Sequence, residues 1–301
     1  MERLPVFHIG ANKAGSTTLQ KALFGRHPEV LNLGKPTVHP NMQEALSQIL
    51  VACDRNTRMP RHDSEATRRL WQQTVAHAPE QCVPLFSKEE LIRYQYYGQP
   101  DPLRLPKAIV EMVGPLRVVM VIRHQLRLIE SLYVHKSNSA NFMSPDNWLA
   151  SHPERFSFAY RYHEIADAWS RIVGEQNVGV FLFEELVRDS EVFATHLCDF
   201  VGIDAQVGIK LLSRCHENVR KSKRTQAYAR FRSAVLPKAS LGKLLARPWR
   251  QRWRNYLEGG PRAEVSLPPD WLHRIVEYYR SDNRKLAERF KLPLREYDYP
   301  M

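Results

Sequence analysis

Short apolar runs alternate with stretches of helical periodicity along most of this chain. The apolar runs predict strands at 5–10, 83–87, 117–123 and 177–183. An apolar stripe at helical spacing predicts helices at 63–78, 125–138 and 157–173, and a further amphipathic helix within 267–294. Alternating strands and helices favour a parallel sheet with helices on both faces. The pattern contains no internal repeat and no low-complexity linker, so we expect one α/β domain over residues 1–301.

The first predicted strand runs into a glycine loop that opens a helix. Residues 6–20 read VFHIGANKAGSTTLQ. Backbone N–H groups at such a helix start converge on an anion, and the helix dipole favours negative charge there. The spacing from Gly10 to Gly15 fits the first part of the nucleotide-triphosphate loop G-x-x-x-x-G-K-[ST]. Ser16 stands where that loop has its lysine, and the lysine here is Lys13. We interpret the segment as a phosphate-binding loop that lacks the Walker lysine.

A second candidate site follows the strand at 117–123. Arg123 stands at the carboxyl end of this strand, and Ser131 comes eight residues later, about two helical turns into the next element. Ligands of open α/β sheets bind at the carboxyl edge, where both side chains can face one group. A guanidinium fork matches phosphate bidentately, so Arg123 predicts a second phosphate contact.

The loop K-x-G-S-T at 13–17 and the pair Arg123 and Ser131 together resemble the sulfotransferases that use 3′-phosphoadenosine 5′-phosphosulfate (PAPS). The Y-x-x-D-N-x-x-L pattern at 279–286 resembles the closing helix of carbohydrate and bacterial members. One departure is His124-Gln125, where the family often has Asp-Pro after the arginine. The resemblance implies a P-loop-NTPase-like fold that covers nearly the whole chain.

The resemblance also implies roles for these residues. Lys13 would stabilise charge on the leaving phosphate, and Arg123 with Ser131 would hold the 3′-phosphate of PAPS and of its product, PAP. The 5′-phosphate would lie against the loop residues Ala14, Gly15, Ser16, Thr17 and Thr18. No metal ion is required by this scheme, and the strand that ends at Arg123 offers no Walker-B aspartate.

The chain carries a net charge of +12 and has an isoelectric point near 9.6, which indicates an anionic partner. The basic residues are densest at 214–254, and a basic amphipathic segment covers about 217–262. The cluster at 220–224 resembles the late basic loop that closes over the 3′-phosphate, with the contact left open among Lys221, Lys223 and Arg224. Leucine and tryptophan interleave with the basic residues at 238–256, which suits a membrane surface, a glycan or a docked surface helix. No nucleic-acid recognition motif accompanies the charge, so we expect no nucleic-acid partner.

An acceptor hydroxyl needs a general base within hydrogen-bond reach. The strand at 83–87 delivers Lys88, Glu89 and Glu90 to the carboxyl edge of the sheet. We choose Glu89 as the base and Glu90 as the second candidate, and Lys88 could assist Lys13. Glu89 could equally be a solvated carboxylate at a helix start. The segment 34–39, with Lys35 and His39, competes for the same role.

These features predict transfer of sulfonate from PAPS to a hydroxyl, and we expect that hydroxyl on a carbohydrate, polysaccharide or glycolipid. The alternatives are a P-loop kinase and a non-catalytic nucleotide- or polyanion-binding protein. The chain has no apolar run of the ~20 residues that span a bilayer. Its four cysteines show no C-x-x-C spacing, which favours reduced thiols. We therefore expect a cytoplasmic enzyme that resembles the bacterial, soluble relatives.

Overall fold

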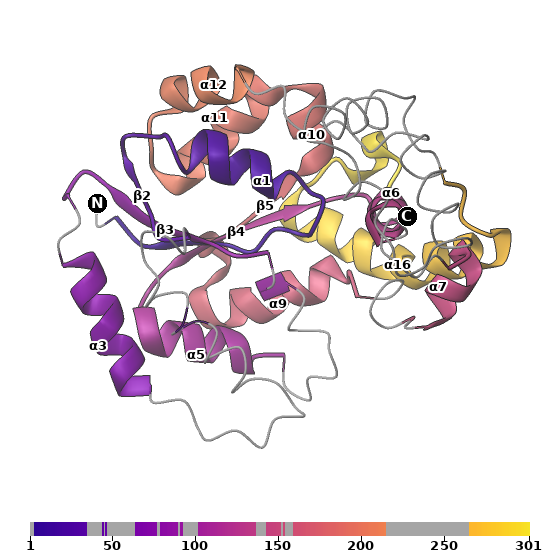
Figure 1. The fold of residues 1–301 in the computed structure, drawn as a ribbon, viewed down its shortest axis with the longest axis horizontal. Helices are drawn as coiled ribbons and strands as arrows, with labels where there is room; N and C mark the ends of the chain where they lie inside the picture. The colour runs from indigo at the N-terminus through magenta and orange to yellow at the C-terminus, as the bar shows by residue number, and fades with distance from the viewer. Residues whose placement is uncertain are drawn as a thin grey trace, which may run out of the picture. The chain divides into compact units, whose positions relative to one another are not determined.

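The computed structural model describes residues 3–34, 44, 46, 64–76, 79–89, 91–92, 102–136, 143–151, 153, 159–214 and 265–301 (Figure 1). The chain divides into two compact units. The first comprises 1–124, 159–216 and 279–301, and the second comprises 125–158 and 217–278. The single domain over 1–301 stays a prediction. The basic segment at 217–262 lies outside the described residues.

A five-stranded parallel sheet forms the centre of the first unit. The strands are β1 (Val6–His8), β2 (Val30–Asn32), β3 (Val83–Ser87), β4 (Arg117–Ile122) and β5 (Val178–Leu182). Their order is β2-β3-β1-β4-β5, and every pair is parallel. After β1 the chain moves toward β2, whereas after β4 it moves toward β5. The direction of winding therefore reverses between β1 and β4, which is where open α/β sheets bind their ligands.

Helices cover both faces of this sheet, as predicted. Figure 1 shows α3 (Ser64–Val75), α5 (Arg104–Val113) and α9 (Tyr162–Val173) below the sheet. On the other face lie α1 (Ser16–Thr18), α11 (Ser190–Val201) and α12 (Ala205–Ser213). The connections add the π-helical turn η1 (Leu19–Leu23), the 3-10 turn η2 (Glu175–Asn177) and helix α10 (Phe183–Arg188). The α/β fold expected from the alternating pattern is confirmed.

The central strands are apolar on both sides because both faces of the sheet are covered. Val118 through Ile122 in β4 are all buried, and so are all five residues of β3. The sequence pattern placed β3, β4 and β5 to within about one residue. It missed β2, whose three residues are only half-buried at the sheet edge and give no continuous apolar run.

The C-terminal helix α16 (Pro269–Phe290) continues into η3 (Leu294–Tyr297). The Y-x-x-D-N residues of α16 contact backbone groups of the first unit. The Tyr279 hydroxyl accepts a hydrogen bond from the Tyr160 N–H, and the Asn283 amide donates to the Pro300 carbonyl. The Asp282 carboxylate accepts from two N–H groups in the first turn of α9. This motif therefore fastens α9 and the C-terminal segment in place.

The second unit contains α6 (Gln125–Lys136), α7 (Pro145–Ser151) and the first half of α16. The Tyr133 ring packs edge-on against Trp148, 5.5 Å between centroids, and the Tyr133 hydroxyl donates to the Met143 carbonyl. The Trp271 indole N–H donates to Asp146 over 2.7 Å. These contacts join α6, α7 and α16 within the unit.

Candidate active site

The predicted phosphate-binding loop leaves the sheet at the end of its central strand, β1, beside β4. Pairing with β4 continues past β1, because the N–H groups of Ile9 and Ala11 donate to carbonyls of that strand at 2.9 and 2.8 Å. The chain then turns through Lys13, whose φ is 66°, and Gly15, whose φ is 79°. Helix α1 starts at Ser16, where the first N–H groups of a helix have no intrahelical partner. The loop thus presents backbone donors at the carboxyl edge of the sheet.

Both loop glycines are required by close contacts. A Cβ on Gly15 would lie 2.9 Å from Leu186 and 3.1 Å from the Phe183 ring, in addition to the cost of positive φ for an L-residue. A Cβ on Gly10 would lie 2.6 Å from the Nε2 atom of His8. Side chains from α10 and β1 therefore press directly against the loop and fix its path.

Arg123 joins the loop to the end of β4. Its guanidinium donates to the Lys13 carbonyl over 2.6 Å and lies over the Phe183 ring, 4.8 Å from the centroid. The Arg123 carbonyl accepts a hydrogen bond from the Tyr162 hydroxyl at 2.8 Å. Arg123 is 94% buried, so its position is set by packing as well as by these bonds. The two motifs that the sequence singled out meet at the winding reversal between β1 and β4.

A buried polar network begins at His124, the residue after Arg123. The Glu184 carboxylate accepts from the His124 N–H at 3.1 Å and from the Tyr299 hydroxyl at 2.9 Å. The His124 ring packs on the Tyr299 ring, and its Nε2 lies 2.7 Å from the Asp298 carbonyl. Burial raises the pKa of Tyr299 and of Tyr162 well above the ordinary phenol value, and nearby ionisable groups raise both further. Both phenols are therefore neutral hydrogen-bond donors.

His8 occupies the space beneath the loop. It is fully buried, and its Nδ1 lies 2.7 Å from the Ser87 hydroxyl, which also accepts from the Gln20 amide at 2.9 Å. The Nε2 atom of His8 has no hydrogen-bond partner among the described residues. Burial lowers the pKa of His8 to about 3, so the imidazole is neutral. The contacts tie the ends of β1 and β3 to η1 just below the phosphate-binding loop.

The hydroxyl side chains of the loop face different environments. Ser16 is buried, with its Oγ at 3.5 Å from the Ala11 carbonyl, whereas Thr17 is exposed. Lys13 is half-buried, Ala14 is buried, and Thr18 is 91% buried. Contact of these residues with a 5′-phosphate stays a prediction.

The other predicted site residues are placed as follows. Ser131 is half-buried on α6 in the second unit, so its relation to Arg123 stays a prediction. Glu89 lies in the turn after β3, half-buried, and the preceding Lys88 N–H donates to the His8 carbonyl. This places Glu89 beside the end of β1, while its role as a base stays a prediction. Outside the described residues lie Glu90, Lys35, His39, Lys221, Lys223, Arg224 and the segment 238–256.

Sequence reasoning missed the groups that surround Arg123. Glu184 follows the predicted strand at 177–183, so the rule that selected Arg123 and Glu89 at strand ends also applied to it. Tyr162 and Tyr299 approach from segments 39 and 115 residues away from their hydrogen-bond partners. His124 departs from the family pattern and gave no indication that it contacts the C-terminal segment.

Two further properties concern the described part of the chain alone. None of its helices is both long and apolar enough to cross a membrane. None of its His, Cys, Asp and Glu side chains gather in groups of three or more that could hold a metal ion.

Comparison with one solved structure supports the fold. A sulfotransferase from Alicyclobacillus acidocaldarius is 14% identical, with 99% of this chain and 100% of that chain covered and a TM-score of 0.61. The sulfotransferase domain of the Synechococcus PCC 7002 olefin synthase is 16% identical, with 91% of this chain and 94% of that chain covered and a TM-score of 0.43. A sulfotransferase domain from the curacin biosynthetic pathway is 12% identical, with 91% of this chain and 97% of that chain covered and a TM-score of 0.42.

Among curated proteins, none matches this chain. A profile of the sulfotransferase family, however, matches residues 5–206, which include the loop at 10–18, Arg123, Ser131 and all five strands. That stretch is about two thirds of the chain. The chain is an enzyme that belongs to the sulfotransferase family.

Proposed function

We propose that this sulfotransferase takes its sulfonate from PAPS and transfers it to a hydroxyl of a carbohydrate, polysaccharide or glycolipid. The observation that carries the donor assignment is the hydrogen bond from Arg123 to the Lys13 carbonyl. It holds a cation suited to a phosphate beside a loop of backbone donors suited to another phosphate. A nucleotide with phosphates at both its 5′ and 3′ positions fits such a pair of subsites.

The proposed reaction forms a bond between the acceptor oxygen and sulfur as the bond from sulfur to the bridging oxygen breaks. The electron pair of the broken bond goes to the 5′-phosphate of PAP. Lys13 and the N–H groups of the loop stabilise that developing charge, which is most of what such a displacement requires. The proton of the acceptor hydroxyl goes to Glu89, with Glu90 as the second candidate.

The acceptor class rests on the resemblance to carbohydrate sulfotransferases and on the net charge of +12, which attracts acidic glycans. The basic loop residues Lys221, Lys223 and Arg224 would close over the 3′-phosphate. The segment 238–256 would contact the glycan or a membrane surface. We also propose a cytoplasmic location and no nucleic-acid partner.

Calorimetry with PAP, AMP, ATP and a DNA duplex tests the donor assignment. We expect PAP to bind more tightly than AMP, because the 3′-phosphate adds a charge-assisted contact. Equal affinities for PAP and AMP, or a preference for ATP, would contradict it. Incubation with ³⁵S-labelled PAPS and a panel of glycans, glycolipids and simple phenols tests the acceptor. Labelling of phenols alone would contradict the carbohydrate assignment and leave the donor assignment standing.

A further inference from the structure

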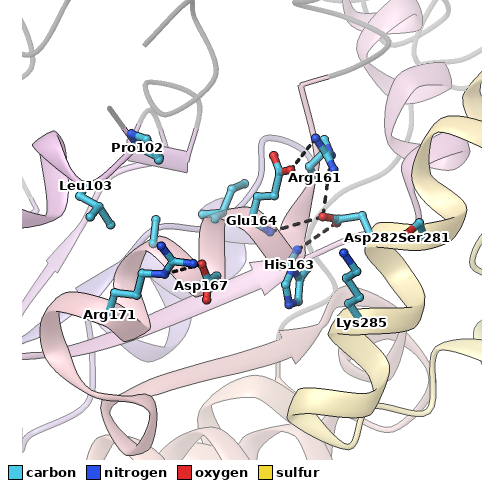
Figure 2. A pocket seen from close by; sticks show the side chains of 12 residues that line it. Pro102, Leu103, Arg161, His163, Glu164, Asp167, Arg171, Ser281, Asp282 and Lys285 are labelled. Atoms are coloured by element: carbon cyan, nitrogen blue, oxygen red, sulfur yellow. Dashed lines mark hydrogen bonds and ion pairs between the residues drawn. The ribbon is translucent and has the colours of Figure 1, made fainter. Parts of the chain in front are cut away.

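A cavity of about 420 Å³ lies between α9 with the residue that precedes it, the segment just before α5 and the second half of α16 (Figure 2). Its volume is within the range of small-molecule sites. All of its lining residues belong to the first unit, and none belongs to the phosphate-binding loop. Figure 1 shows α9 on the face of the sheet opposite α1. The cavity is therefore separate from the candidate active site.

The three acidic side chains of the cavity are already satisfied by neighbouring groups. The two oxygens of Asp282 accept from the His163 and Glu164 N–H groups at 3.0 and 3.3 Å. Glu164 forms an ion pair with Arg161. The two oxygens of Asp167 are paired separately, one with Arg171 at 2.8 Å and the other with Arg289 at 2.7 Å (Figure 2 draws the first of these).

The groups left to meet a ligand are donors. Within the described part of the chain, the side chains of Lys285, His163 and Ser281 have no hydrogen bond or ion pair with another residue. Figure 2 shows Lys285 and His163 side by side at one end of the cavity. The Lys285 ammonium is therefore the cation of this cavity that no carboxylate neutralises.

The charged groups that shift the pKa of His163 also indicate an excess of positive charge in this cavity. Burial lowers the pKa of His163, and the positive charges of Arg289, Lys285 and Arg161 lower it further against the opposing effect of Asp167. Three cations thus act against one carboxylate at this point. A neutral imidazole in such surroundings retains one N–H to donate.

We propose that this cavity binds a small molecule that combines an oxyanion, either carboxylate, phosphate or sulfate, with an apolar body. The oxyanion lies against Lys285 and accepts from His163 and Ser281. The apolar body lies against the aliphatic lining supplied by Pro102, Leu103 and Ile165. Charge-assisted hydrogen bonds of this kind are the strong ones, which suits a cavity with one unneutralised ammonium.

Crystals of the full chain soaked with 4-bromophenyl phosphate locate the site directly through the anomalous signal of bromine. We expect a bromine peak near Leu103 with the phosphate at Lys285, and no peak there with the uncharged 4-bromophenol. A peak at the phosphate-binding loop alone, or no peak at all, overturns the proposal.

Titration calorimetry with the same phosphate ester tests the residue that carries the proposal. Lys285→Met should raise the dissociation constant of this site by about tenfold or more, the scale of one charge-assisted hydrogen bond. Lys285→Arg should retain most of the affinity. Lys210→Met, which removes an exposed lysine of α12 outside the cavity, is the matched control and should change nothing. Unaltered affinity in Lys285→Met overturns the proposal.

Discussion

Replacing Arg123 by methionine tests two roles of its guanidinium: the hydrogen bond to the Lys13 carbonyl and the proposed contact with a 3′-phosphate. Methionine keeps an apolar stem against Phe183 and removes every donor of the guanidinium. The lost bond to the Lys13 carbonyl loosens the loop and weakens any nucleotide that the loop holds. Loss of the proposed contact with a 3′-phosphate would weaken only nucleotides that carry one. A hydrogen bond to a charged group contributes about 1.5–3 kcal/mol. PAP should therefore lose that much more binding energy than AMP, which is roughly a 10- to 150-fold larger rise in dissociation constant.

The assay is calorimetry of PAP and AMP on the wild-type chain and on Arg123→Met. Arg117→Met is a matched control, because Arg117 lies at the opposite end of the same strand and also binds backbone carbonyls, those of Phe200 and Val201. The control should leave the ratio of PAP to AMP affinity unchanged. Equal losses for both nucleotides in Arg123→Met would refute the 3′-phosphate contact and leave Arg123 only as a brace for the loop.

Four further predictions concern the loop and the base. Lys13→Ala should lower kcat by about 10²- to 10³-fold, with a smaller effect on PAP affinity; turnover close to wild type would show that the loop has been misread. Glu89→Gln should lower kcat by about 10²- to 10⁴-fold and remove the rise of kcat with pH; an active variant would move the role to Glu90. Gly10→Ala should cost about 1–3 kcal/mol of unfolding free energy in urea because its Cβ would lie 2.6 Å from His8, and the cost should shrink in a His8→Ala background. Between pH 6.5 and 3 the His8 side chain binds a proton in the unfolded chain but not in the native protein, where its pKa is lowered to about 3. As the pH is lowered through this range, the free energy of unfolding of the wild type should therefore decrease by about 1.4 kcal/mol per pH unit more than that of His8→Gln.

The sequence predicted those parts of the fold and site that depend on local pattern. The strands ending at Ser87, Ile122 and Leu182 are continuous apolar runs, so their carboxyl ends, and the residues that follow them, could be placed on one edge. Glycine spacing identified the loop, because glycine readily adopts a positive φ such as the 79° of Gly15, whereas other residues rarely do. The strand β2 has three half-buried residues and carries no comparable pattern.

What could not be predicted depends on contacts between distant segments. His124 appeared to be a departure at the entry to a helix, but it donates its N–H to Glu184, 60 residues away, and contacts Asp298, 174 residues away. Nothing in the residues near His124 encodes either partner. Similarly, Asp282 was noted as part of a pattern in the closing helix, whereas its function as a cap for α9 requires the folded arrangement.

The contacts around Arg123 show how a buried cation is held at the end of β4. A buried charge needs compensation from the groups around it. Among the described residues, the Lys13 carbonyl accepts one hydrogen bond from the guanidinium, and the Phe183 ring offers its electron-rich face. The buried carboxylate of Glu184, the residue after Phe183, has its two oxygens engaged by the His124 N–H and the Tyr299 hydroxyl. Because burial keeps Tyr299 protonated, it donates to Glu184 rather than adding a second negative charge. The network thus positions the strand end beside the phosphate-binding loop, where we propose that the 3′-phosphate binds.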